Sequence, residues 1–284
     1  MNISYDPTRE ALLHPAVRAT LFKAGDAGRL SLDAICAECS RLAYLRFESS
    51  EEHRALLRDA LALLGAVDWA GFNDPATGTQ AFAAVVPAKA RALVVFRGTE
   101  PDRVSDIGVD LDASTTTWPA GGTVHAGFAN AFDGVKSKIG DWLARHPGID
   151  VVFSGHSLGA ALATLSASNW VASNLITFGS PRVGNPGFAQ TIKAQAVARY
   201  VDCCDVVPHV PPETPWYSHV GEALYIDHTG KLCARITQDE IEVDRAKARI
   251  DYIEQYAWRL DSAPVRDLAD HAPINYERAL LPAT

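Results

Sequence analysis

The stretch VVFSGHSLGAALATL, residues 151–165, decides the fold of this chain. Its first three residues are apolar and favour a short buried strand, and residues 160–165 form a strong helix-forming run. Between them lies the pattern Gly-x-Ser-x-Gly with Ser157 at its centre. A strand, a tight turn and a helix in this order are typical of an elbow that presents a nucleophilic serine. We therefore predict that Ser157 is a nucleophile.

The two glycines of the pattern have a steric reason to lack side chains. Gly155 and Gly159 flank a strained turn, and the helix that follows must pack closely against its strand. The backbone N–H of Leu158, at the start of that helix, is placed to bind an oxyanion. A glycine-rich turn of a nucleotide-binding sheet is the alternative, but phosphate loops have a different spacing and no Walker lysine follows.

Predicted strands and helices alternate on both sides of this stretch. Strands are predicted over 80–86, 92–96, 175–178 and 197–201, and helices over 127–145 and 158–171. This alternation predicts an α/β fold with a central, mostly parallel sheet and helices on both faces.

The remaining segments are expected to complete one domain over residues 1–284, a length that one α/β sheet domain accommodates. Two amphipathic helices over 31–64 are expected to cover the sheet. Residues 223–236 are expected to form a hairpin. A helix is predicted over 239–260, with four apolar residues on one face: Ile250, Ile253, Ala257 and Leu260.

Charge and composition limit the partners. The chain carries 26 Lys and Arg against 34 Asp and Glu, a formal net charge of −8. This balance excludes nucleic acid as a main partner, and contact with a lipid interface is expected to be transient at most. The first residues show no signal-peptide pattern and no run of eighteen apolar residues occurs, so a cytoplasmic location is favoured over secretion. The spacing of the five cysteines indicates neither a disulfide framework nor a zinc site, and oligomeric state is left open.

A serine nucleophile needs a histidine base and a carboxylate, in the chain order serine, acid, histidine. Asp205 is the best acid, because it follows the predicted strand 197–201 and chemistry gathers at the carboxyl ends of such strands. Spacing alone leaves the other acids and the base open. The candidates are Asp202, Glu213, Glu222 and Asp227 for the acid, and His209, His219, His228 and His271 for the base.

Five ordered segments resemble the class 3 lipases, the fungal-type lipase and feruloyl-esterase-like family of the α/β-hydrolases. The resemblance covers most of residues 30–280. The segments are VVFRGT (94–99), VHAGF (124–128), GHSLG (155–159), FGSPRVGN (178–185) and DVVPHVPP (205–212).

The resemblance implies the α/β-hydrolase fold and assigns the remaining roles. The family's acid corresponds to Asp205, and its late histidine after an aspartate corresponds to His271. The first oxyanion donor corresponds to Thr99, and Leu158 N–H would be the second. No metal and no cofactor are implied. His125, His156, His209 and Arg182 also match family motifs, and we interpret them as structural.

A candidate lid covers about residues 100–112. Val104, Ile107 and Leu111 would share one helical face, and Asp110 would support Thr99. The family often has Asp-Trp-x-x-Asp-Leu here, whereas this chain has DIGVDL over 106–111 and lacks the tryptophan. An ordinary polar surface loop is the alternative interpretation.

The resulting hypothesis is a serine carboxylic-ester hydrolase, a lipase or esterase acting on acylglycerols or on short- to medium-chain esters through an acyl-enzyme. Phospholipase A1 and feruloyl-type esterase share the same machinery and stay as alternatives. The alternative from another class is a catalytically silent lipid- or partner-binding protein of the same fold. Such a protein is expected to lack one of the reactive residues, whereas this chain has all of them. A serine peptidase has no supporting feature.

Overall fold

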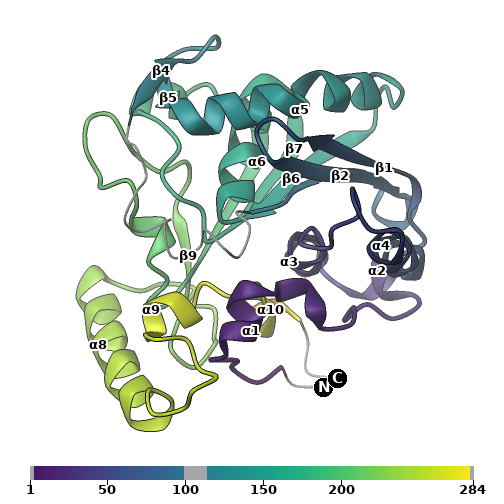
Figure 1. Ribbon diagram of the computed structural model, residues 1–284. Coiled ribbons are helices and arrows are strands. Elements are labelled where there is room, and N and C mark those ends of the chain that lie inside the picture. Colours follow the sequence, from purple (N-terminus) through teal and green to yellow (C-terminus); the bar gives the residue numbers. More distant parts are fainter. Residues whose placement is uncertain (1–2, 99–113, 282–284) are drawn as a thin grey trace.

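The computed structural model describes residues 3–98 and 114–281 and is built around a seven-stranded sheet (Figure 1). The strand order is β1-β2-β3-β6-β7-β8-β9. The first two pairings are antiparallel, and every pairing from β3 to β9 is parallel, which confirms the predicted mostly parallel sheet. The strands are β1 (Val67–Asp74), β2 (Thr79–Val86), β3 (Arg91–Phe96), β6 (Asp150–His156), β7 (Ala172–Phe178), β8 (Ala194–Asp202) and β9 (Ala223–Ile226).

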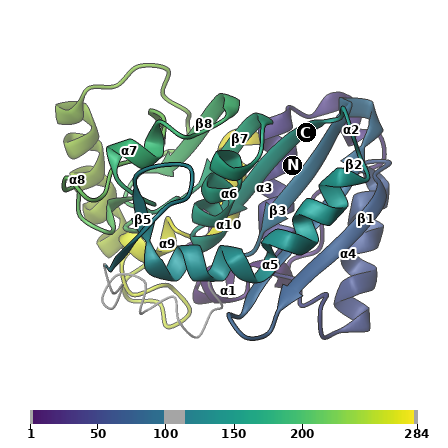
Figure 2. The ribbon, with the colours of Figure 1, turned by 90° about the horizontal axis from the view of Figure 1, so that it is seen from above.

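Helices cover both faces of the sheet (Figures 1 and 2). On one face, α5 (Ala126–Ala144) and α6 (Leu158–Asn169) pack over a core that contains Phe132, Ile139 and Trp142. On the other, α3 (Leu32–Leu42), α4 (Glu51–Leu63) and α10 (Pro273–Leu280) enclose a second core around Ile35, Leu57 and Phe82. Both α3 and α4 fall within the range 31–64 in which covering helices are expected.

The composition of α6 explains its central position. Residues 159–168 are all buried, because α6 packs on β3, β6 and β7 with α5 beside it. Alanines at four of these ten positions keep the helix narrow without costing helix propensity. Strand β6 ends directly before α6, so the turn between them lies at the carboxyl end of a central strand.

The remaining elements are short and lie around the sheet. A separate two-stranded sheet pairs β4 (Thr115–Thr117) with β5 (Thr123–His125). The short helices are α1 (Arg9–Leu13), η1 (Pro15–Val17), α2 (Asp26–Arg29), η2 (Pro87–Lys89), α7 (Pro186–Ala189), η4 (Val207–His209) and α9 (Arg266–Ala269). Within the described ranges, no helix has both the length and the apolar character needed to cross a bilayer.

Helix α8 (Gln238–Gln255) lies at the edge of the molecule, where Ala248 packs with Val201 of β8 and Tyr225 of β9 (Figures 1 and 2). The helix confirms the prediction over 239–260 except for its end, because α8 stops at Gln255, and the predicted apolar face is not the face that it buries. Ile250, Ile253 and Leu260 are 58%, 65% and 95% exposed. The helix is amphipathic about a different face, which buries Arg245, Ala248 and Tyr252.

The expected hairpin over 223–236 forms only in part, as a short antiparallel turn after β9. Only β9 forms, and it pairs with β8 in parallel. The chain after it turns back through a single bridge between Ile226 and Leu232. The parallel pairing extends the main sheet by one strand, and the carbonyl of Tyr225 in β9 accepts from the N–H of Cys233 in the returning chain at 2.8 Å.

Candidate active site

Ser157 lies in a sharp turn between β6 and α6. Its backbone has φ 59° and ψ −129°, and φ is rarely positive for a residue with a side chain. The neighbouring glycines allow this turn. A Cβ on Gly155 would lie 2.4 Å from the carbonyl carbon of Gly159, and a Cβ on Gly159 would lie 2.2 Å from the carbonyl oxygen of Phe96. The close approach of helix and strand therefore requires glycine at both positions.

The imidazole of His271 lies between Ser157 and Asp205. Its Nε2 is 2.9 Å from Ser157 Oγ, and its Nδ1 is 3.0 and 2.9 Å from the two carboxylate oxygens of Asp205. All three side chains are buried. Because an ionised carboxylate can only accept, Nδ1 carries the proton and Nε2 is left to accept from the serine hydroxyl. The hydrogen bonds thus align a proton acceptor with Ser157.

Three separate elements bring these residues together. Ser157 follows β6, Asp205 comes three residues after the end of β8, and His271 lies between α9 and α10. The strands β6 and β8 both pair with β7, so their carboxyl ends lie at one edge of the sheet.

Asp205 is held by donors other than His271. Val207 N–H donates to Oδ1 at 2.8 Å, and the hydroxyl of Tyr276 donates to Oδ2 at 2.5 Å. Burial, followed by the negative charge of Asp205, raises the pKa of Tyr276 well above its usual value. Tyr276 therefore remains a donor to the carboxylate over the physiological range.

His156 packs beside the site but has different partners. Its Nδ1 is 2.8 Å from the hydroxyl of Tyr44, and its ring centroid lies 4.4 Å from that of His271. Burial, together with the neighbouring His271, lowers the pKa of His156 well below its usual value. The ring therefore stays neutral and packs against His271 without adding a charge.

The expected oxyanion donors are described only in part. Leu158 is the first residue of α6, so its N–H is one of those that no carbonyl within the helix can accept from. Thr99 lies outside the described residues, as do the expected lid and support residues Val104, Ile107, Asp110 and Leu111.

The chain just before Thr99 is firmly fixed. Arg97 donates to both carboxylate oxygens of Glu48, at 2.9 and 2.6 Å, and to the carbonyls of Ala43 and Leu45. Burial raises the pKa of Glu48, but the bonds and charge of Arg97 outweigh it and lower that pKa below its usual value. A Cβ on Gly98 would lie 2.0 Å from the Tyr44 hydroxyl oxygen, so Gly98 fits tightly beside the site.

The other candidate bases have other contacts. His219 Nε2 lies 2.7 Å from the carbonyl oxygen of Pro208, and His228 pairs with Asp244. His209 ends the short helix η4, and its backbone carbonyl accepts from Arg182. His125, which we interpret as structural, accepts from Phe128 N–H through its ring at the start of α5.

The other candidate acids do not reach His271 through any contact that the structure gives. Asp202 is fully buried 4.0 Å from Arg278, and burial, followed by the charge of Asp270, raises its pKa well above the usual value. Glu213 lies 3.6 Å from Arg182, and Asp227 accepts from Thr229 and Lys231 in a surface turn. Glu222 is exposed.

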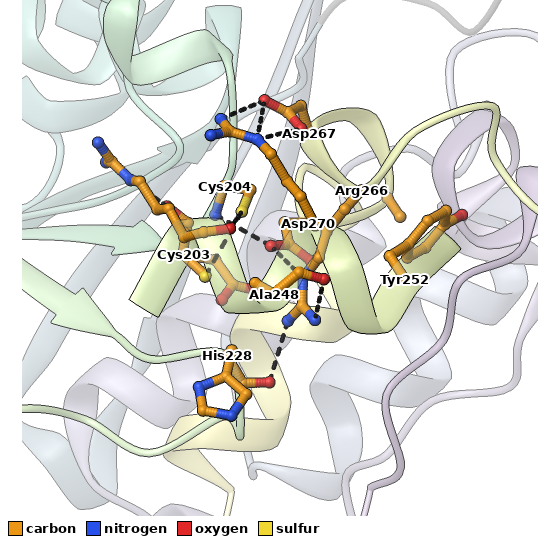
Figure 3. A network of polar contacts seen from close by, with 12 residues as sticks. Cys203, Cys204, His228, Ala248, Tyr252, Arg266, Asp267 and Asp270 are labelled. Atoms are coloured by element: carbon orange, nitrogen blue, oxygen red, sulfur yellow. Dashed lines mark hydrogen bonds and ion pairs between the residues drawn. The ribbon is translucent and has the colours of Figure 1, made fainter. Parts of the chain in front are cut away.

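Among the described residues, one group offers three potential metal ligands close together: Cys203, Cys204 and Asp270. Figure 3 shows this group with its polar neighbours. The carboxylate of Asp270 is already used, because it accepts from Arg266 Nε and from Cys204 N–H, both at 3.0 Å. A guanidinium thus occupies the position that a cation would need, so the group does not fit a metal ion.

Sequence reasoning missed several residues around the site. Tyr44 is 112 residues from His156, and Tyr5 is 265 residues from its partner Asp270. Both are single tyrosines outside the matched motifs, so no local pattern could have indicated them.

Comparison with known proteins finds lipases that are similar to part of this chain. The family model described as lipase (class 3) matches residues 93–214. A lipase of Rhizopus niveus is 32% identical over 164 residues, which cover 52% of this chain and 42% of that protein. The secreted mono- and diacylglycerol lipase 1 of Fusarium solani is 32% identical over 177 residues, covering 59% and 53%. The chain thus spans about half the length of the curated relatives it matches.

A solved structure supports the same fold. Lipase II from Rhizopus niveus superposes with a TM-score of 0.57 at 24% identity, over 74% of this chain and 85% of that one. The sheet order and the serine turn between β6 and α6 define an α/β-hydrolase. Within that class, residues 93–214 match the class 3 lipase model, and the relatives that the chain resembles include fungal lipases.

Proposed function

We propose that this protein is a serine carboxylic-ester hydrolase of the lipase type, with acylglycerols as its substrates. The observation that carries the proposal is the hydrogen-bonded series Ser157 Oγ, His271 Nε2, His271 Nδ1 and Asp205, buried at the carboxyl edge of the sheet. The names of the fungal relatives support the substrate class.

In the proposed reaction, Ser157 Oγ attacks the ester carbonyl carbon while His271 Nε2 takes the hydroxyl proton. The tetrahedral intermediate collapses, the alcohol leaves with the proton from Nε2, and the acyl group stays as an ester on Ser157. Water then adds to this ester, again giving its proton to Nε2. The second collapse releases the carboxylic acid and restores the serine hydroxyl.

Asp205 has an electrostatic role in this scheme. It fixes the tautomer of His271 and stabilises the imidazolium that forms in each half-reaction. We assign Leu158 N–H and Thr99 to the oxyanion, and residues 100–112, with Val104, Ile107, Asp110 and Leu111, to a lid or its support. Oxyanion donors act on charge that develops only in the transition state, so they raise kcat.

The finer substrate assignment is also a proposal. We favour mono-, di- or triacylglycerols or short- to medium-chain esters over phospholipids and feruloyl esters, because two relatives are named as a lipase and as a mono- and diacylglycerol lipase. A panel of tributyrin, monoacylglycerol, phosphatidylcholine and methyl ferulate separates these classes. Phospholipid or ferulate turnover at least tenfold faster than glyceride turnover would contradict the choice.

We further propose a single domain over residues 1–284 and contact with lipid only at the substrate interface. A cytoplasmic location stays a prediction from the sequence, and the Fusarium solani relative, which is named as a secreted lipase, does not favour it.

The direct test replaces the nucleophile. We expect Ser157→Ala to lower kcat for p-nitrophenyl butyrate by about 10⁶-fold, as removal of a triad serine does. Ser154→Ala is the matched control, because Ser154 is equally buried in β6, the strand that leads to Ser157, but its hydroxyl faces Ser40. A folded Ser157→Ala protein that keeps a tenth of the parent's activity would rule out the proposed reaction.

A further inference from the structure

The carboxylate of Asp270 joins three distant segments next to the proposed site (Figure 3). Asp270 directly precedes His271, and its Oδ2 accepts from the N–H of Cys204, which directly precedes Asp205. The same oxygen accepts from Arg266 Nε at the start of α9. One buried carboxylate therefore links the backbone just before Asp205 to the backbone just before His271.

The N-terminal segment supplies the third partner. Tyr5 donates its hydroxyl to Asp270 Oδ1 at 2.8 Å. Its ring contacts two guanidinium groups, with Arg266 Cζ 4.9 Å and Arg278 Cζ 4.8 Å from the ring centroid. Burial, followed by the charge of Asp270, raises the pKa of Tyr5, so the hydroxyl keeps its proton.

A second contact ties the same segment to the loop of His271. Asp6 N–H donates to Asn275 Oδ1, and Asn275 Nδ2 donates back to the carbonyl of Asp6, both at 2.9 Å. Asn275 Nδ2 also donates to the carbonyl of Ala269 at 2.9 Å. Asn275 thus connects Asp6 to Ala269, on the other side of His271. Together with the bond from Tyr5 to Asp270, the N-terminal segment contacts the chain both before and after the histidine.

The N-terminal segment makes further contacts after Asp6. Ala263 N–H donates to the carbonyl of Pro7, and Arg9 N–H donates to the carbonyl of Asp261. Helix α1 then lies beside α9 and α10, as Figure 1 shows. We call residues 3–13 the N-terminal strap.

We propose that the N-terminal strap, acting through Tyr5, is a positioning element that holds His271 at hydrogen-bonding distance from Ser157. This inference rests on the proposed function of Ser157, His271 and Asp205. Tyr5 acts through Asp270 and does not touch the reacting atoms, so it is a positioning residue.

The local structure around His271 explains why it needs such support. His271 lies between α9, which has only four residues, and α10. Its own backbone N–H reaches only the carbonyl of Leu268. General-base catalysis needs the imidazole within hydrogen-bond reach of the hydroxyl, and a displacement near 1 Å can lower a rate by about 10²-fold. The contacts of Asp270 therefore fix a loop that its short helix cannot fix alone.

The test is Tyr5→Phe in the full chain, assayed with p-nitrophenyl butyrate. The substitution removes one hydroxyl and leaves the ring against Arg266 and Arg278. We expect kcat to fall about tenfold, the size of effect that one lost hydrogen bond to a charged group gives, while KM changes less than twofold. A positioning role predicts this split between kcat and KM, whereas a loss of folded protein lowers the apparent kcat only in proportion to the unfolded fraction.

The matched control is Tyr225→Phe. Tyr225 also donates a buried hydroxyl to an aspartate, Asp244 Oδ2 at 2.9 Å, but Asp244 does not adjoin His271 in the chain. We expect the kcat of Tyr225→Phe to stay within twofold of the parent's, once it is corrected for the fraction of folded protein measured by circular dichroism. A kcat for Tyr5→Phe within twofold of the parent, or an equal loss in Tyr225→Phe, overturns the proposal.

A second variant covers the case in which Tyr5→Phe does not fold. The carboxylate of Asp6 organises the strap by accepting from Thr8 N–H and Thr8 Oγ1 and by pairing with Arg18. Asp6→Ala should lower kcat at least threefold at constant KM, and an unchanged kcat counts against the strap. If activity survives Ser157→Ala, the proposed function fails. If activity depends on Ser157 but neither strap variant lowers kcat, only the positioning role fails.

Discussion

At the scale of single residues, the surroundings of Asp205 decide how well it can support His271. A buried carboxylate is costly unless donors compensate for the lost water, and Asp205 has donors from His271, Tyr276 and the Val207 backbone. Each donor also removes a rotation of the carboxylate, so the imidazole ring faces a fixed partner.

Tyr276 is the donor to Asp205 that a conservative side-chain substitution removes, together with the bond that its hydroxyl accepts from Asp202 N–H. We expect Tyr276→Phe to lower kcat about tenfold with little change in KM, because Asp205 keeps its charge but loses a short hydrogen bond. Steady-state kinetics on a soluble ester measure both constants. A variant with the parent's kcat would show that the Val207 and His271 contacts suffice.

Gly159 tests the steric account of the turn. Gly159→Ala would place a methyl group 2.2 Å from the carbonyl oxygen of Phe96, so α6 must shift away from β3. We expect a loss of about 1–3 kcal/mol in the free energy of unfolding and a lower kcat. Gly28→Ala is the control, since a Cβ there meets nothing within 4 Å. Equal melting temperatures for the two variants would contradict the account.

At the scale of elements, α8 shows where sequence patterns mislead. Its apolar residues do recur at helical spacing, yet Val243, Ile250 and Ile253 are exposed and the buried face is formed by Arg245, Ala248 and Tyr252. Arg245 is buried because its guanidinium donates to the carbonyl of Cys203, and Tyr252 donates to the carbonyl of Ala263. The hydrogen bonds that polar side chains make to distant backbone groups, and not the apolar residues, thus determine which face of α8 is buried.

This orientation predicts different outcomes for two substitutions on α8. We expect Ile253→Gln to change the free energy of unfolding by less than about 0.5 kcal/mol, as exposed substitutions usually do. Ala248→Leu adds volume at a position with no exposed area and should cost about 1–3 kcal/mol. Denaturant titration measures both. A larger loss for Ile253→Gln than for Ala248→Leu would reverse the assigned faces.

The predictable part of the fold is the part with strong local signals. Residues 151–165 carry a buried strand, two sterically required glycines and a helix-forming run in one stretch, so the strand, the turn and the helix were all predictable. Hydrophobic periodicity likewise indicated β2, β3, α5, β7 and β8. The direction of β9 depends on which strand it meets, and that is a property of the assembled sheet.

The site also has a part that the sequence predicts and a part that it does not. Ser157 follows from the residues themselves, and the resemblance to a family was needed to choose His271 among four candidate histidines. The histidine meets Ser157 across 114 residues of chain, and no local pattern encodes that contact. Tyr5, Tyr44 and Asn275 were not predicted, because each contributes a single polar group through tertiary packing.

At the scale of the whole molecule, buried histidines couple stability to pH. His219 is partly buried, and this burial, followed by the charge of Arg199, lowers its pKa to about 3; the pKa of the fully buried His156 is also lowered. An unfolded histidine has a pKa of about 6.5. Below pH 6.5 the unfolded chain therefore binds protons that the folded chain does not, and the free energy of unfolding falls as pH falls toward 3.

We expect the melting temperature to drop between pH 7.5 and pH 5, and His219→Gln to reduce that drop. At pH 5 the contribution of His219 amounts to about 2 kcal/mol, because 1.5 pH units lie between 6.5 and 5. His14→Gln is the control, since His14 is exposed. Thermal melts at both pH values measure this drop. An equal drop in melting temperature in His219→Gln and the parent would exclude a contribution of His219 to the pH dependence of stability.

The central claim is that Ser157 is activated by His271, and covalent labelling tests it most directly. A fluorophosphonate should form one adduct per chain, and peptide mass mapping should find it on Ser157. The rate constant of labelling should fall by at least about 10³-fold in folded His271→Ala. An adduct on another residue, or equal labelling rates in the parent and His271→Ala, would contradict the account.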